Sequence, residues 1–147
     1  MEGVLFCCPP AWEKLLPPGV RGAAVPEVLG ERFWPLLALT RRGCEALGET
    51  AALCRVLLAP GDSGGSLGRI SAETVVTYGL SPRDSLTLSS LTEPVLCVQR
   101  HLRRPDGTII EPQEFPLPAL PEPAEDLLPL LGTMLLQLPQ TTAPFPW

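Results

Sequence analysis

Two adjacent cysteines end the first apolar segment of the chain. Cys7 and Cys8 follow the run from Gly3 to Phe6 and precede two prolines, and the ends of buried strands often face a ligand crevice. A thiolate at such a place is a nucleophile, whereas a buried thiol is a small apolar group. Because the only histidine, His101, is remote in the sequence, we favour buried thiols and keep a ligand site as the alternative.

A glycine-rich segment, Pro60 to Gly68, follows a later apolar run. Backbone N–H groups of such a segment can hold an anion. It lacks the Gly-Lys-Ser/Thr ending of a phosphate-binding loop, and no helix evidently follows it, so a plain connector is the favoured interpretation. If the chain has a ligand site, its candidate residues are Cys7, Cys8, Gly61, Asp62, Ser63, Gly64, Gly65, Gly79, Ser81 and Asp84.

Three arginines surround the single histidine. Arg100, Arg103 and Arg104 flank His101, where such charges either form the solvated face of an edge strand or hold a phosphate or a partner's carboxylates. The solvated face is the favoured interpretation. Asp62, Asp84 and Asp106 lie at expected turns, where an aspartate side chain accepts bonds from backbone N–H groups.

Composition narrows the classes of function. The chain has 147 residues, a net charge of −5 and 45% hydrophobic residues, which predicts one globular domain over 1–139 and a flexible tail over 140–147. The acidic balance argues against nucleic-acid binding. The longest apolar run, near 127–138, is too short for a membrane span, and no signal peptide is recognisable. Five cysteines without metal-ligand spacing indicate reduced thiols in the cytoplasm. We expect no metal, cofactor, nucleic acid or membrane partner.

The first half of the chain alternates between expected strands and short helices. Apolar or β-branched runs predict strands over 3–8, 22–25 and 54–59. A helix is expected over 31–42, with Pro35 in its first turn and Gly43 as its stop, and a further helical turn over 45–52. This alternation favours an α/β domain.

The second half is expected to form a strand, a meander and a helix. Thr74 to Tyr78 reads as a strand, ended by Gly79 and Ser81-Pro82. A three-strand meander follows over 86–91, 95–98 and 108–110, and then a stiff proline-rich passage over 111–123. A helix over 127–138 offers a broad leucine face. The fold prediction is α/β, a small Rossmann-like sheet with an antiparallel meander and a covering C-terminal helix.

The segment 56–138 resembles the second half of the central ATP-binding domain of Mur ligases and folylpolyglutamate synthases. The matching residues are the run from Val75 to Leu80 (Val-Val-Thr-Tyr-Gly-Leu), Arg83-Asp84, the meander and the last helix. The chain is also similar to small bacterial proteins with a Tyr-Gly-Leu-Ser-Pro-Arg-Asp core and a Glu-Pro-Gln-Glu-Phe-Pro ending. The first resemblance implies descent from a nucleotide-binding domain.

The chain departs from that family at its catalytic positions. The only lysine, Lys14, lies outside the matching segment, and Ala59-Pro60-Gly61-Asp62 stands where an Asn-x-Asp-Asp pattern is expected. ATP-dependent ligation is therefore not expected. We predict a non-catalytic interaction or regulatory module with a protein partner or a second copy of itself. The alternative is a small-molecule- or nucleotide-binding protein, or an enzyme, that uses a crevice near Cys7, Gly61–Gly68 and Gly79–Ser81.

Overall fold

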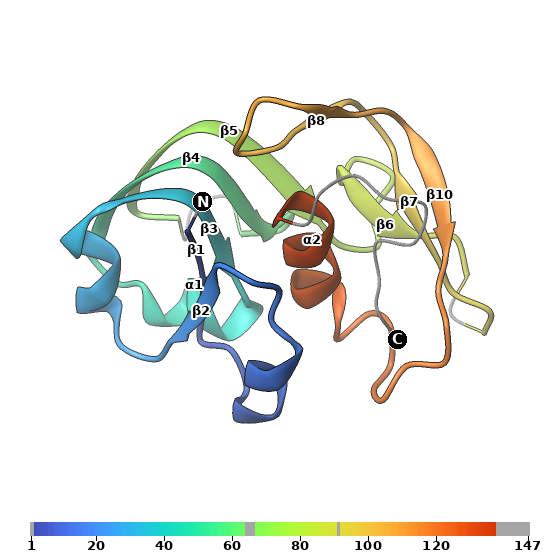
Figure 1. The fold of residues 1–147 in the computed structure, drawn as a ribbon, viewed down its shortest axis with the longest axis horizontal. Helices are drawn as coiled ribbons and strands as arrows, with labels where there is room; N and C mark the ends of the chain where they lie inside the picture. Colours follow the sequence, from blue (N-terminus) through green and yellow to red (C-terminus); the bar gives the residue numbers. More distant parts are fainter. Residues whose placement is uncertain (1, 64–66, 91, 138–147) are drawn as a thin grey trace.

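One curved sheet of eight strands forms the centre of the fold. The structure is a computed structural model, which describes residues 2–63, 67–90 and 92–137. The strand order is β10-β7-β6-β5-β4-β3-β1-β2, and a separate two-stranded sheet pairs β8 with β9 (Figure 1). The strands are β1 (Gly3–Phe6), β2 (Val20–Ala23), β3 (Phe33–Leu39), β4 (Ala51–Pro60), β5 (Arg69–Tyr78), β6 (Leu86–Leu88), β7 (Val95–Val98), β8 (Leu102–Arg103), β9 (Ile109–Ile110) and β10 (Gln113–Pro116).

The sheet is mostly parallel, so the chain is a mixed α/β protein, as predicted. Strands β1 to β6 pair in parallel, and β7 and β10 are added antiparallel at one edge. After β1 the chain places β2 on one side of it and β3 on the other, and β4 and β5 continue outward from β3. The short connections contain two 3-10 helices, η1 (Pro10–Leu15) and η2 (Pro26–Glu31), and one α-helix, α1 (Arg41–Ala46).

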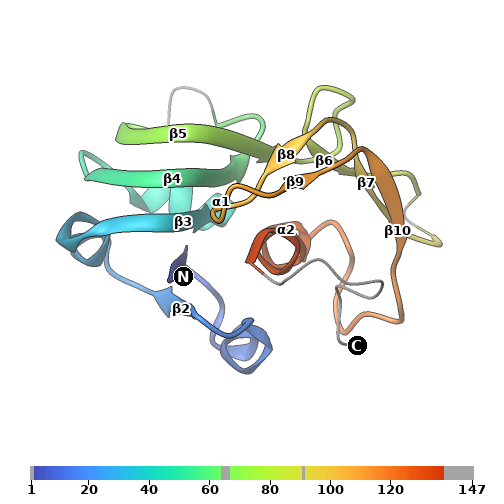
Figure 2. The ribbon, with the colours of Figure 1, turned by 45° about the horizontal axis from the view of Figure 1, so that its top comes forward.

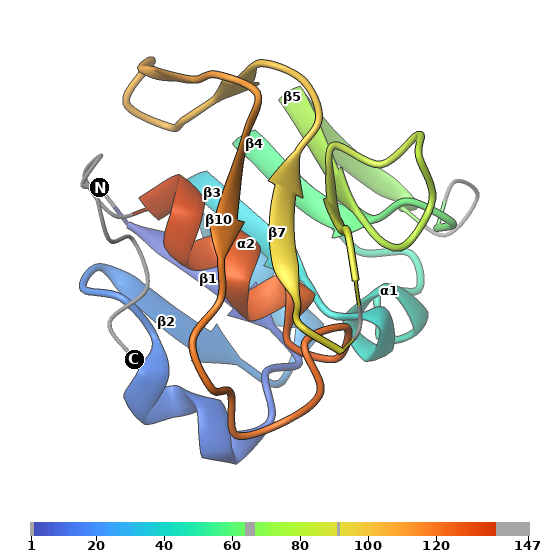
Figure 3. The same ribbon diagram turned by 90° about the vertical axis from the view of Figure 1, so that its right-hand side faces the viewer.

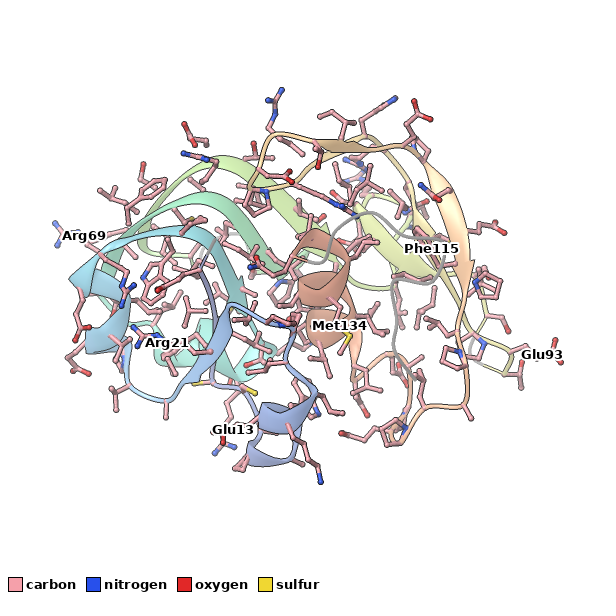
Figure 4. All side chains as sticks on the ribbon, viewed as in Figure 1. Glu13, Arg21, Arg69, Glu93, Phe115 and Met134 are labelled. Atoms are coloured by element: carbon pink, nitrogen blue, oxygen red, sulfur yellow. The ribbon has the colours of Figure 1, made fainter. Side chains whose placement is uncertain are left out.

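A single longer helix, α2 (Leu128–Gln137), occupies the concave side of the sheet. Figure 2 shows it end-on between the parallel strands and the antiparallel edge, and Figure 3 shows β10 and β7 crossing it. Every residue from Leu128 to Leu136 is buried. Such all-round burial is typical of a helix enclosed by its own domain. Met134 on α2 and Phe115 on β10 belong to the same apolar cluster and are labelled in Figure 4.

The helix expected over 31–42 is wrong, because this segment forms β3. Strand β3 pairs in parallel with β1 and with β4. Leu36 and Ala38 enter the apolar cluster on the α2 side, whereas Leu37 and Leu39 enter the cluster on the other side. A strand buried on both faces is apolar at consecutive positions, so its sequence cannot be told from that of a buried helix by periodicity.

The helix that does form in this region is α1, and Gly43 lies inside it rather than at its end. Thr40 is its N-cap, with the Thr40 hydroxyl accepting a bond from the Gly43 N–H. A Cβ at position 43 would lie 2.8 Å from the Phe6 carbonyl oxygen. Glycine therefore permits close packing of α1 against β1. The helical turn expected over 45–52 is also wrong, since α1 ends at Ala46 and β4 begins at Ala51.

The third strand of the expected meander is not the one that the sequence indicated. Residues 109–110 form β9, which pairs with β8 outside the main sheet. The third strand is β10, from within the proline-rich passage, and it pairs with β7. Pro116 ends this strand at the sheet edge, where a missing N–H is tolerated. The predicted tail over 140–147 lies outside the described residues.

Candidate ligand crevice

A hollow lies where β1 and β3 end. It has a volume of about 670 Å³, within the range of small-molecule sites. Its lining comes from the turn after β1, the start of α1, the end of β5 and the segment before α2. The lining residues are Cys7, Cys8, Pro9, Pro10, Trp12, Ala24, Thr40, Arg41, Arg42, Tyr78, Glu122, Glu125, Asp126 and Pro129.

The position of this crevice follows from the strand order. Because β2 and β3 leave β1 in opposite directions, the connections after β1 and after β3 separate at this point. In open α/β sheets ligands bind in the crevice that such a switch point creates, at the carboxyl ends of the strands. The crevice therefore lies where the topology favours a binding site.

The turn after β1 is fixed on both sides. Cys7 has φ +60°, in the left-handed region that favours glycine. Its N–H donates to the Ala23 carbonyl on β2 (2.8 Å), and its carbonyl accepts from the Thr40 hydroxyl after β3 (3.2 Å). Non-glycine residues held in this conformation cost about 1–3 kcal/mol and are frequent at functional sites. The two neighbouring strands thus hold the crevice wall in one conformation.

Charges of opposite sign come from different elements around the crevice. Arg41 forms an ion pair with Asp62, in which its Nη1 donates to both carboxylate oxygens, at 2.7 and 2.8 Å. Arg42 has no hydrogen bond or ion pair within the described residues. Glu122 accepts a bond from the Trp12 indole N–H (2.8 Å), and Glu125 and Asp126 are exposed. The crevice therefore has one unpaired cation near α1 and a group of acids before α2.

The two cysteine thiols of the crevice are poor nucleophiles at neutral pH. Burial raises the pKa of Cys8 to about 11, and the negative charge of Glu13 acts in the same direction. Burial also raises the pKa of Cys7, although the positive charge of Arg42 opposes the shift. Since the thiolate is the reactive form, both groups stay protonated near pH 7.

Several of the predicted site residues come together elsewhere, around Asp84. This side chain is buried, and its carboxylate accepts a bond from the Ser81 N–H (3.1 Å). A Cβ at Gly61 would lie 1.7 Å from one Asp84 oxygen, and a Cβ at Gly79 would lie 2.4 Å from the other. Asp84 thus fills the turn between the ends of β4 and β5. None of these four residues lines the crevice.

The remaining candidates of the glycine-rich segment lie apart from the crevice lining. Asp62 is exposed in its ion pair with Arg41, and the Ser63 hydroxyl donates to the Pro60 carbonyl. Gly64 and Gly65 lie outside the described residues. Of the eight ligand-site candidates that the structure describes, only Cys7 and Cys8 line the crevice, with Asp62 held at its border through Arg41.

The three candidate arginines do not converge on one point. Arg100 donates to the Arg83 carbonyl (2.7 Å), and Arg103 is exposed on β8. Arg104 is 4% exposed, and among the described residues its Nε has no hydrogen-bond partner. Burial lowers the pKa of Arg104, opposed by the charge of Asp106. The arrangement offers no common anion site for all three.

Most residues of the crevice were not predicted from the sequence. Arg42, Trp12 and Tyr78 lie on three different elements, and nothing in their sequence spacing joins them. Thr40 could have been found, because Thr40 before Gly43 has the spacing of a capping residue at a helix start. The helix expected over 31–42 placed Thr40 inside a helix, so Thr40 was not considered as a capping residue.

Comparisons with known proteins give no family or function for this chain, so a functional assignment depends on the geometry of the site. Comparison with protein-family models, with curated proteins and with solved structures finds no match to this chain. In the described part of the chain no group of three His, Cys, Asp or Glu side chains is placed to hold a metal ion. Nor does any helix there have the length and apolar character needed to cross a membrane.

Proposed function

We propose that the chain is a small-molecule-binding module whose site is the crevice at the ends of β1 and β3. The observation that carries this proposal is the coincidence of that crevice with the switch point of the sheet. The same order, β2-β1-β3-β4-β5, supports descent from a Rossmann-like nucleotide-binding domain. We propose that the resemblance of residues 56–138 to the Mur ligases reflects the same descent.

The lining residues favour a small molecule with a single anionic group over a nucleoside triphosphate. Glu122, Glu125 and Asp126 would repel a polyphosphate, whereas Arg42 suits a single anionic group. A small molecule with one carboxylate or phosphate and with amino or hydroxyl donors satisfies both sides. The prolines and Trp12 then contact its apolar part. We propose binding without chemistry, because both thiols are protonated near pH 7.

Thermal-shift measurements with a panel of nucleotides, amino acids and sugar phosphates test the proposal. A ligand present at about 100 times its Kd should stabilise the fold by about 2.7 kcal/mol. Ala24→Trp, which fills the crevice mouth, and Arg42→Ala, which removes its unpaired cation, should abolish the shift. Arg83→Ala, an exposed arginine that does not line the crevice, is the matched control. A shift that survives both crevice variants would contradict the assignment.

A further inference from the structure

The acidic side of the crevice is a turn whose backbone is fixed. We call it the acidic wall, and its charged residues are Glu122, Glu125 and Asp126. The Asp126 N–H donates to the Pro123 carbonyl (3.0 Å), and the Leu127 N–H donates to the Ala124 carbonyl (3.1 Å). Ala124 and Leu127 are buried, whereas the three acids are exposed. The burial of its apolar residues therefore holds the acidic wall in place while its carboxylates stay accessible.

The carboxylate of Glu122 is oriented by a buried side chain. Trp12 is 3% exposed and packs in the apolar cluster on the α2 side of the sheet. Its indole N–H donates to Glu122 Oε2 (2.8 Å), and Glu122 Oε1 has no hydrogen-bond partner among the described residues. The indole has one donor and no acceptor, so it holds one carboxylate oxygen and leaves the other for a ligand. An acceptor oriented before a ligand arrives lowers the entropy lost on binding.

The acidic wall has no cation of its own. Within the described residues none of its three carboxylates forms an ion pair. Arg42, the unpaired cation of the crevice, belongs to a different element, α1. A ligand that fills the crevice displaces water from both, and desolvation of a charge is costly unless an opposite charge replaces that water. Charge complementarity therefore requires a ligand with a positive group for the wall and a negative group for Arg42.

We infer that the ligand of the crevice is an amino acid, whose ammonium group binds Glu122 and whose carboxylate binds Arg42. This inference rests on the proposed binding function and names its ligand class. An ammonium group has three donors and no acceptor, so it suits a wall of carboxylates. The planar guanidinium of Arg42 matches a carboxylate through two parallel hydrogen bonds. The ring of Trp12 favours an amino acid with an apolar side chain, such as leucine or phenylalanine.

Two other chemistries fit the acidic wall less well. A hydroxyl group is a neutral donor, so a hydroxy acid leaves the desolvated charge of Glu122 uncompensated. A phosphate group can carry a second negative charge into a crevice that already holds three carboxylates, and like charges oppose binding. Hydroxy acids and phosphates are therefore the compounds that discriminate between an amino-acid site and other anion sites.

Matched pairs of ligands test the ammonium site. Isothermal titration calorimetry of the whole chain compares phenylalanine with phenyllactate, and leucine with α-hydroxyisocaproate. Within each pair only the amino group is replaced by a hydroxyl group, so shape and carboxylate are kept. The preferred amino acid should bind about tenfold tighter or more than its hydroxy acid, which is the effect of one hydrogen bond between charged groups.

Glu122→Gln assigns this preference to one side chain. The variant removes the charge but keeps an oxygen that can accept the Trp12 hydrogen bond. It should abolish the preference for the amino acid, while the hydroxy acid binds as it does to the wild type. Glu93→Gln is the matched control, because Glu93 is exposed and does not line the crevice. This control should keep the full preference.

The outcomes separate this inference from the proposed function. Hydroxy acids that bind as tightly as amino acids, or a preference that survives Glu122→Gln, would overturn the ammonium site and leave the crevice as a binding site. The same holds if only a nucleotide or a sugar phosphate binds and Ala24→Trp abolishes its binding. If no compound of the panel binds, or if Ala24→Trp leaves all binding intact, both the inference and the proposed function are wrong.

Discussion

At the scale of single residues, Asp84 was singled out from the sequence as a site candidate, and in the structure its carboxylate packs inside a turn. The sequence singled out Asp84, Gly61 and Gly79 as parts of a ligand site. The structure brings these three together, but as a packed turn in which the carboxylate occupies the space that two glycines leave open. The types and positions of these residues indicated that they have a specific role. Their contact could not be predicted, because it joins two loops that are distant in the sequence and depends on the parallel pairing of β4 with β5.

Gly61→Ala should therefore destabilise the fold. The new methyl group would lie 1.7 Å from an Asp84 oxygen, so the buried aspartate or the turn has to move. Overpacking of this kind costs about 1–3 kcal/mol. Urea denaturation of the purified variant measures the loss.

The same clash predicts a non-additive double variant. Asp84→Ala removes the obstructing carboxylate, so Gly61→Ala should cost much less in that background than in the wild type. Gly30→Ala is the control, because its Cβ would meet only the Ala51 carbonyl oxygen at 3.4 Å. Equal costs of Gly61→Ala in both backgrounds would show that the contact is not the cause.

Cys8 should react slowly with thiol reagents at neutral pH. Burial and Glu13 raise the pKa of this thiol to about 11, and the alkylation rate follows the thiolate fraction. In the folded protein the rate should rise about tenfold for each pH unit up to that value. Mass spectrometry of iodoacetamide-treated protein measures it, with urea-unfolded chain as the reference. A plateau near pH 8–9 in the folded state would indicate an ordinary, accessible thiol.

At the scale of elements, strands with β-branched or glycine-bounded sequences were predictable and the central apolar strand was not. The strand predicted over 54–59 lies within β4, and that over 74–78 lies within β5. Strand β3 was taken for a helix because Phe33 to Leu39 is apolar at nearly every position. Pairing with β1 and β4 makes this segment a strand and not a helix. Sequence periodicity gives no information about that pairing.

Leu131→Ala in α2 should cost about 2–5 kcal/mol of unfolding free energy, the usual range for leucine in a core. Leu131 is fully buried, and its neighbour Gly132 packs so closely that a Cβ there would lie 2.8 Å from a Leu58 methyl carbon. Leu131→Asp should prevent folding, because it also buries a charge. Glu125→Ala, an exposed change just before the helix, is the control. An unchanged melting transition in Leu131→Asp would mean that α2 does not support the sheet.

At the scale of the whole molecule, the fold class could be predicted and the crevice largely could not. The alternation of elements was enough to predict the α/β class. The crevice needs Cys7 after β1, Arg42 after β3 and Glu125 before α2 in one place. That assembly follows from the strand order, in which β1 lies between β2 and β3. A single sequence does not reveal this order, because the connections are too short to be recognised as crossover helices.

The distribution of buried acids with raised pKa predicts that the molecule loses stability in alkali. Burial raises the pKa of Cys54 to about 12 and of Cys8 to about 11, and it also raises the pKa values of Cys7, Cys44 and Tyr78. Below about pH 7 all five groups are protonated in both the folded and the unfolded chain. Above it the unfolded chain releases protons that the folded chain keeps, so the free energy of unfolding falls with rising pH. For Cys54, which is 2% exposed, the slope is about 1.4 kcal/mol per pH unit until the folded thiol ionises.

Urea titrations between about pH 8 and pH 10.5 measure this slope, since the thiols of the unfolded chain ionise in that range. Cys54→Ala should be less stable at pH 8, because it leaves a small cavity, yet it should lose less stability as the pH rises. Cys97→Ala, a half-buried thiol on β7, is the matched control. A stability that stays constant over this range would contradict the argument, since it would require the buried thiols to ionise as readily in the fold as in the unfolded chain.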